Sequence, residues 1–76
     1  MTIQILGTGC AKCKTLLTNT QAAVQALELS ADVEKVEDIQ QIIRFGVMTT
    51  PALVVDGTVK VAGRVPSAEE IKELLR

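Results

Sequence analysis

The sequence predicts an α/β fold in which four strands and three helices follow one another in the order β-α-β-α-β-β-α. Three features predict this order: the β-rich run TIQIL before a long stretch with helical spacing, the Asp56-Gly57 pair between two short apolar runs, and a closing amphipathic segment, EEIKELLR. A strand-helix-strand start requires a right-handed crossover and parallel pairing, whereas a hairpin adds antiparallel strands. We therefore expect a four-stranded mixed sheet flanked by three helices, within a single domain spanning residues 1-76.

The first half of the chain supplies a strand, a long helix and a second strand. Residues 2–6 form the first strand, and Gly7, Thr8 and Gly9 end it in a tight turn. Residues 10–29 form the helix, because side chains at three- and four-residue steps make one stripe: Cys13, Leu16, Leu17, Thr20, Ala23, Val24 and Leu27. Residues 31–36 form a strand whose charges suit a sheet edge.

A short helix is predicted after the second strand. Asp38 can cap its first turn, and Gly46 can end it. The spacing of Ile39, Ile42 and Ile43 predicts that all three face inward.

The last third of the chain reads as a hairpin followed by a helix. Residues 52–55 and 58–61 are short strands, and the Asp-Gly pair between them suits a type I′ turn. Ser67 and Glu70 have the spacing of a capping box, in which each side chain binds the other residue's backbone N–H. The buried face of the final helix is then Ile71, Leu74 and Leu75.

Charge and hydropathy exclude several classes of partner. The net charge of −1 provides no basic surface for nucleic acid or for an anionic membrane. No apolar stretch approaches the roughly 20 residues that span a bilayer, and the segment MTIQILG lacks the features of a secretory signal. We expect a cytoplasmic protein that contacts neither nucleic acid nor membrane.

Both cysteines lie in the segment TGCAKC, where a strand gives way to a helix. Unpaired N–H groups and the helix dipole favour a thiolate at Cys10, so we expect the pKa of its thiol below the ordinary cysteine value. Lys12 adds a positive charge nearby, although solvent screens it. Cys13 lies one turn further along the same face and is more buried. This asymmetry suits dithiol exchange, with Cys10 as the nucleophile and Cys13 as the resolving residue.

Other readings of the pair remain open at this stage. Both residues could simply be small core side chains. Two thiolates could also hold a soft ion such as Cu(I), in a delivery module, although a chain without histidine cannot complete a common tetrahedral zinc site from this pair. Small heavy-metal-binding domains share the strand, loop and Cys-x-x-Cys start but end on a strand, whereas this chain ends on a helix. A regulatory domain that senses redox state without catalysis is a third possibility.

Taken together, GCAKC, VMTTPALVVDGTVKVAG and the closing helix resemble the thioredoxin and glutaredoxin superfamily. The resemblance covers almost the whole chain and is greatest to the short thioredoxin-like redox-active disulfide proteins of archaea and bacteria, also called glutaredoxin-like thioredoxins. It implies a thioredoxin-like fold and a cis peptide bond between Thr50 and Pro51. It also implies that the Thr50 backbone pairs with an extended substrate and that Gly63 leaves room for it.

The same resemblance implies a thiol-disulfide oxidoreductase that reduces protein disulfides through a mixed disulfide. Its partners would be disulfide-containing proteins and a thioredoxin-reductase-type or other dithiol reductant. It implies no organic cofactor and no metal, and we expect a monomer.

Several residues depart from the larger families. Gly9 replaces the Trp that precedes the first cysteine of thioredoxins, and Ala11-Lys12 replaces Gly-Pro. Gly63 is not followed by the acidic turn with which glutaredoxins hold glutathione. The buried carboxylate that assists the second cysteine of thioredoxin has no clear equivalent, because Asp32 and Glu34 fall on the predicted edge strand; water or Lys12 could replace it, or no specific acceptor is needed.

Overall fold

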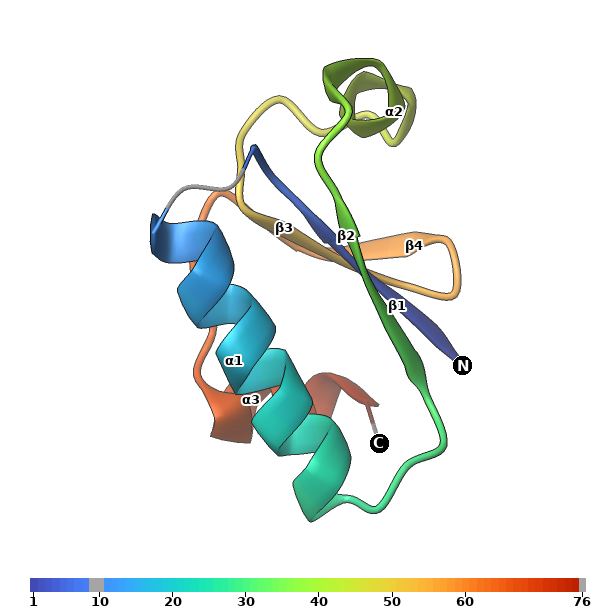
Figure 1. Ribbon diagram of the computed structural model, residues 1–76, viewed down its shortest axis with the longest axis vertical. Coiled ribbons are helices and arrows are strands. Elements are labelled where there is room, and N and C mark those ends of the chain that lie inside the picture. Colours follow the sequence, from blue (N-terminus) through green and yellow to red (C-terminus); the bar gives the residue numbers. More distant parts are fainter. Residues whose placement is uncertain (9–10, 76) are drawn as a thin grey trace.

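The predicted order of elements is present in the computed structural model, which describes residues 1–8 and 11–75 (Figure 1). Within these residues the elements are β1 (Thr2–Leu6), α1 (Ala11–Ala26), β2 (Asp32–Val36), α2 (Ile39–Arg44), β3 (Ala52–Val55), β4 (Thr58–Ala62) and α3 (Ala68–Leu75). The α/β fold class, with a mixed sheet and flanking helices, is confirmed.

The sheet has the strand order β2-β1-β3-β4, so β2 is an edge strand, as its charges predict. β1 pairs in parallel with β2 and antiparallel with β3, and β3 pairs antiparallel with β4. Helices α1 and α3 pack together on one face, and α2 lies at the far end of the sheet from the C-terminus (Figure 1).

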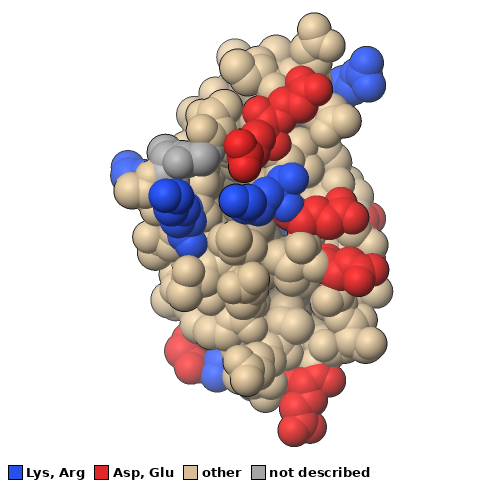
Figure 2. Space-filling view, viewed as in Figure 1, with Lys and Arg blue, Asp and Glu red and all other residues tan. Residues whose placement is uncertain are grey.

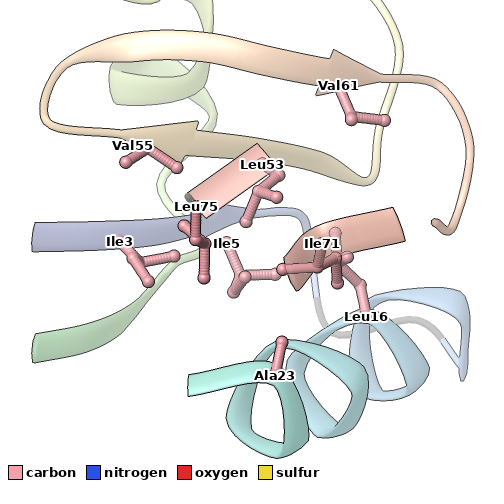
Figure 3. Close-up of a cluster of buried hydrophobic side chains, with 9 residues drawn as sticks. All are labelled: Ile3, Ile5, Leu16, Ala23, Leu53, Val55, Val61, Ile71 and Leu75. Carbon is pink, nitrogen blue, oxygen red and sulfur yellow. The ribbon is translucent and has the colours of Figure 1, made fainter. Parts of the chain in front are cut away.

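Alternation along β1 divides its side chains between two buried clusters. The side chains of Ile3 and Ile5 lie on the sheet face that α1 and α3 cover. There they form one buried cluster with side chains of the two helices, which include Leu16, Ala23, Ile71 and Leu75 (Figure 3). Leu6 belongs instead to the cluster around Ile42 of α2. β1 is therefore packed on both faces, and its last residue, Leu6, is buried in the second cluster.

Helix α1 ends at Ala26 rather than at residue 29 as predicted. Glu28 adopts a positive φ of 53°, and the N–H of Leu29 donates to the carbonyl oxygen of Val24 at 3.1 Å. This turn satisfies carbonyls of the last helical turn without a glycine, so the apolar spacing continues through Leu27 beyond the helix itself.

Helix α2 begins and ends as predicted, but its apolar face is arranged differently. The Asp38 carboxylate accepts a hydrogen bond from the N–H of Gln40 at 2.9 Å, and Gly46 follows the helix with φ of 78°. Of its three isoleucines, only Ile42 is buried, whereas the side chains of Ile39 and Ile43 are 61% and 64% exposed. The prediction that all three face inward is wrong, because a helix of six residues contacts the sheet through one turn and its flanking side chains pass beside it.

The hairpin between β3 and β4 has the predicted turn. Asp56 and Gly57 have φ values of 49° and 82°, the pair of positive angles that a type I′ turn requires. The Asp56 carboxylate also accepts a hydrogen bond from the N–H of Thr2 at 2.8 Å, which ties the hairpin to the start of β1.

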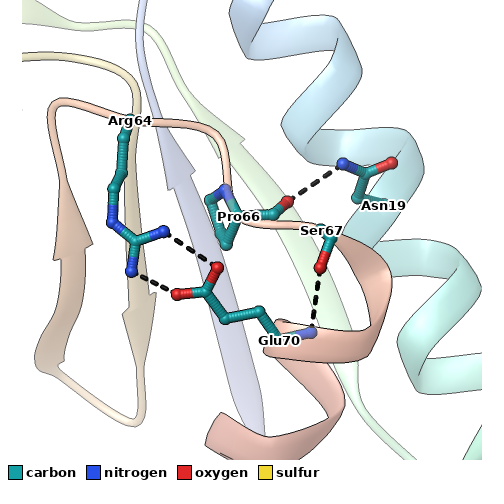
Figure 4. Close-up of polar contacts among 5 residues, drawn as sticks. All are labelled: Asn19, Arg64, Pro66, Ser67 and Glu70. Carbon is teal, nitrogen blue, oxygen red and sulfur yellow. Dashed lines mark hydrogen bonds and ion pairs between the residues drawn. The ribbon is translucent and has the colours of Figure 1, made fainter.

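The start of α3 contains half of the predicted capping box (Figure 4). The Ser67 hydroxyl accepts a hydrogen bond from the N–H of Glu70 at 3.2 Å, as expected. The Glu70 carboxylate binds the guanidinium of Arg64 through both oxygens, so the reciprocal half of the box is not formed. The hydrogen bonds from Arg64 hold the pKa of Glu70 below its ordinary value; desolvation opposes this shift, and the positive charge of Arg64 adds a smaller lowering effect.

The loop before α3 is also tied to α1. The side-chain amide of Asn19 donates to the carbonyl oxygen of Pro66 at 3.0 Å (Figure 4). Since α1 also packs along α3, this contact fixes the segment that leads from β4 into the last helix.

Charged side chains of both signs are interspersed on the face that Figure 2 shows, in keeping with the small net charge. Among the described residues, no helix combines the length and the apolar character needed to cross a membrane.

Candidate functional site

One row of paired residues crosses the whole sheet and brings Pro51 and Gly63, two of the predicted site residues, to the end of the sheet where Gly7 follows β1. Leu6 of β1 pairs with Val36 on one side and with Ala52 on the other, and Ala52 pairs in turn with Ala62 of β4. The residues next to this row in the chain are Gly7, Glu37, Pro51 and Gly63. Segments that lie far apart in the sequence therefore meet just beyond this row (Figure 1).

The Cys13 sulfur lies directly against the end of β1. Cys13 belongs to the first turns of α1, and its side chain is only 6% exposed. A Cβ atom added to Gly7 would lie 2.2 Å from Cys13 Sγ, a distance at which atoms cannot coexist. Gly7 has no positive φ, so the sequence needs glycine here for space rather than for backbone freedom.

The backbone around Pro51 joins the loop before β3 to the end of β4. The Thr50–Pro51 peptide bond is cis, and the N–H of Gly63 donates to the carbonyl oxygen of Pro51 at 2.9 Å. Pro51 is buried, whereas Thr50 and Gly63 are exposed. Gly63 has φ of 82°, and an added Cβ would lie 2.7 Å from Thr49 Oγ1, so both conformation and space require glycine.

A small cavity lies beside the Cys13 side chain. It has a volume of about 30 Å³ and is bounded in part by Gly7, Cys13, Lys35 and Glu37. Lys35 and Glu37 form an ion pair with 3.7 Å between Nζ and Oε1, and each side chain is about half exposed. Lys14 of α1 also lines this cavity, whose only carboxylate among the described residues is Glu37, directly after β2, not Asp32 or Glu34.

A much larger groove lies at the same end of the sheet, between α2 and the loop that leads to β3. Its volume is about 730 Å³, and Thr8 and Thr50 form the end nearest the site. The exposed isoleucines of α2 and Met48 form much of the remainder.

Two further residues of the predicted site are Cys10 and Lys12. Cys10 lies outside the described residues, so its distance to Cys13 is not assigned. Lys12 is an exposed residue of α1. Within residues 1–8 and 11–75, no three His, Cys, Asp or Glu side chains group together in a way that could hold a metal ion.

Sequence reasoning missed the steric role of Gly7 and the groove formed by α2. Gly7 belongs to the run of turn residues before the helix, so the sequence predicts only a role in the turn. It does not predict the contact with Cys13, six positions later. The groove could not be predicted from the helical spacing of the α2 isoleucines, because this spacing is the same whether all of them are buried or only one is. The signal available in the sequence was Met48, a large apolar residue in the segment between Gly46 and Thr50, where no strand or helix is predicted.

Comparison with known proteins agrees with this architecture. The family described as "Thioredoxin domain" matches residues 1–76. The chain is 48% identical to a thioredoxin of Methanothermobacter thermautotrophicus over 75 residues, which cover 99% of this chain and 97% of the relative. It is 40% identical to a thioredoxin of Methanocaldococcus jannaschii over 74 residues, covering 97% of this chain and 85% of the relative. The chain therefore belongs to the thioredoxin-domain family, within the thioredoxin and glutaredoxin superfamily.

Proposed function

We propose that this protein reduces protein disulfides through a dithiol-disulfide cycle of Cys10 and Cys13. As a thioredoxin-like protein it is a disulfide oxidoreductase. The observation that best supports the proposed mechanism is the burial of Cys13, three residues after Cys10 in the sequence, against Gly7. A protected second sulfur is what a resolving cysteine needs.

The proposed cycle has two exchange steps. The Cys10 thiolate attacks one sulfur of the substrate disulfide, so that a mixed disulfide forms and one substrate thiolate leaves and takes up a proton. The Cys13 thiolate then attacks the Cys10 sulfur, which forms the Cys10–Cys13 disulfide and releases the second substrate thiol. Two electrons pass to the substrate, and a dithiol reductant returns them to the protein.

The segments that meet beside Cys13 support a substrate site there. Thr50 is exposed next to the buried Pro51, and its backbone is the proposed partner for an extended substrate segment. Gly63 is hydrogen-bonded to Pro51 and is proposed to leave room for a substrate there. Lys12 is exposed near the start of α1 and is proposed to stabilise the Cys10 thiolate weakly.

The proposal also covers the oligomeric state, the electron donor and the cellular compartment. The chain acts as one monomeric domain over residues 1–76, with a thioredoxin-reductase-type or other dithiol reductant as its electron donor. The reducing direction suits the cytoplasm, where thiols are kept reduced.

Reduction of insulin in dithiothreitol tests this function. The wild-type protein is expected to accelerate insulin reduction above the rate with dithiothreitol alone, and Cys10→Ser is expected to abolish the acceleration because a hydroxyl does not exchange with disulfides. Gln21→Ser, an exposed substitution in the same helix and away from the cysteines, serves as a control for surface change. Equal rates with and without the wild-type protein, together with tight stoichiometric binding of Cu(I), would instead favour a metal-binding module.

A further inference from the structure

Gly63 contacts the chain on both sides of Thr50, the residue proposed to pair with a substrate backbone. Its N–H donates to the carbonyl oxygen of Pro51 at 2.9 Å, and the position that a Cβ would take lies 2.7 Å from Thr49 Oγ1. The loop after β4 therefore packs against the residue before Thr50 and against the residue after it. A shift of Gly63 would reach Thr50 through both neighbours.

Arg64, the next residue, ties this loop to α3 (Figure 4). Its guanidinium binds both carboxylate oxygens of Glu70, with 2.9 Å between Nη1 and Oε1. Two parallel hydrogen bonds fix the orientation of a guanidinium as well as its position. Ile71, the neighbour of Glu70 in the helix, is completely buried in the core cluster. Arg64 thus connects the loop beside Thr50 to the packed core.

A contribution to stability does not by itself account for this ion pair. The side chains of Arg64 and Glu70 are 57% and 39% exposed, and an exposed ion pair adds little to stability. Glu70 also has the spacing to close a capping box with Ser67, which would satisfy the start of α3 without Arg64. The carboxylate reaches back to the loop instead, and what the pair gains is a fixed position for the residue next to Gly63.

Other contacts hold the far half of the same loop. Val65 packs against the core cluster, and the carbonyl oxygen of Pro66 accepts a hydrogen bond from Asn19 at 3.0 Å. Arg64 precedes both residues and is the first side chain after Gly63. Its contact with α3 therefore acts most directly on the position of Gly63.

We propose that Arg64 and Glu70 are positioning residues for the substrate site. Their ion pair holds Gly63 against the residues on either side of Thr50, so that the Thr50 backbone keeps the orientation that binds an extended substrate segment. This inference rests on the proposed function and adds a determinant of substrate binding to it. The pair acts through the backbone, so it affects the binding of a peptide segment and leaves the disulfide exchange step unchanged.

The test follows oxidation of the reduced protein by increasing concentrations of two disulfides, measured by mass after acid quenching. One is a peptide with an intramolecular disulfide and an extended flanking segment; the other is 5,5′-dithiobis(2-nitrobenzoate), which has no peptide backbone. Arg64→Gln and Glu70→Gln are each expected to raise the half-saturating concentration of the peptide about three- to tenfold, the equivalent of roughly one lost hydrogen bond, with an unchanged maximal rate. The second-order rate with the small disulfide should not change. The double variant should be no worse than either single variant, because all three break the same pair.

Glu69→Gln is the matched control. It removes the same charge from the neighbouring residue and breaks the Glu69–Lys72 ion pair within α3, in which Nζ lies 2.8 Å from Oε1. Its half-saturating concentration is expected to equal that of the wild type. Amide hydrogen exchange then locates the change: the Gly63 N–H should exchange faster in Arg64→Gln and Glu70→Gln, whereas the Ile71 N–H, which donates to Ser67 at the start of α3, should not.

The outcomes separate this inference from the proposed function. Equal half-saturating concentrations in the wild type and in both single variants would refute the positioning role while the oxidoreductase function stands. The same loss with Glu69→Gln, or faster exchange of Ile71 together with Gly63, would also refute it, since the effect would then come from charge or from loosening of α3. Loss of the native fold in either single variant would refute it too, because the pair would then be a structural requirement. If the wild-type protein is oxidised by neither disulfide, the proposed function itself fails.

Discussion

Gly7→Ala tests the placement of the Cys13 sulfur that the mechanism requires. The new Cβ would lie 2.2 Å from Cys13 Sγ and 3.3 Å from Cys13 Cβ, so the sulfur must move. Overpacking of this kind costs about 1–3 kcal/mol. The loss of unfolded-state entropy offsets about 0.4–1 kcal/mol, because the backbone of Gly7 is not in the left-handed region. We expect a net loss of about 1–2 kcal/mol, or roughly 4–16 °C in the melting temperature of a domain of this size.

A double-mutant cycle isolates this contact. Thermal unfolding of the wild type, Gly7→Ala, Cys13→Ala and the double variant is measured with excess dithiothreitol, so that all four proteins are in the same redox state. Cys13→Ala removes the sulfur and leaves the Cβ at 3.3 Å, where a shift of a few tenths of an ångström is enough. We therefore expect Gly7→Ala to cost little in the Cys13→Ala background, with a coupling of about 1 kcal/mol or more. An equal cost in both backgrounds would show that Cys13 does not lie against Gly7.

Three further predictions concern the elements around the site. Gly63→Ala should lower the midpoint of chemical unfolding by the equivalent of about 1–2 kcal/mol, because φ is 82° and the added Cβ meets Thr49; an unchanged midpoint would refute the described backbone. Asp38→Ala should cost about 1 kcal/mol in the same assay by removing the cap of α2, and Asp38→Asn should restore most of it. Since Arg64 lowers the pKa of Glu70, this ion pair stabilises the fold above the ordinary carboxyl value of 4.5, and its contribution is lost as pH falls through the lower folded value. Stability measured against pH should thus fall less steeply on the acid side for Arg64→Gln than for the wild type, and parallel curves would contradict this linkage.

The fold was predictable because local signals agree along most of the chain. The hairpin turn is set by Asp56-Gly57, and the cap of α2 by Asp38, since each depends on residues next to one another in sequence. The end of α1 was predicted three residues too late because Glu28 ends the helix with a positive φ that no glycine announces. At Glu70, the guanidinium of Arg64, six residues earlier in the loop before α3, competes with the capping partner, and the spacing of the capping box does not include it.

The site was less predictable than the fold, since it depends on which strand ends meet. The spacing of Cys10 and Cys13 indicated the chemistry, and the resemblance directed attention to Thr50, Pro51 and Gly63. The contact of Gly7 with Cys13 could not be read from sequence, because it depends on how closely α1 approaches the end of β1.

The groove shows a different limit of sequence patterns. The helical period of Ile39, Ile42 and Ile43 is the same whether the stripe is buried or exposed. Only the packing of α2 shows that Ile42 serves the core while its neighbours remain exposed. Patterns predict which side chains share a face, but the area of the opposing surface decides how many of them are covered.

Trapping of the mixed disulfide tests the central proposal most directly. Reduced Cys13→Ser and Cys10→Ser variants are each incubated with a disulfide-bonded substrate protein and analysed by non-reducing electrophoresis and peptide mass spectrometry. Cys13→Ser should accumulate a covalent complex linked through Cys10, because no second thiol is present to resolve it, whereas Cys10→Ser should form little or none because Cys13 is buried. A complex that forms equally through Cys13, or no complex with either variant, would contradict the assignment of Cys10 as nucleophile and Cys13 as resolving residue.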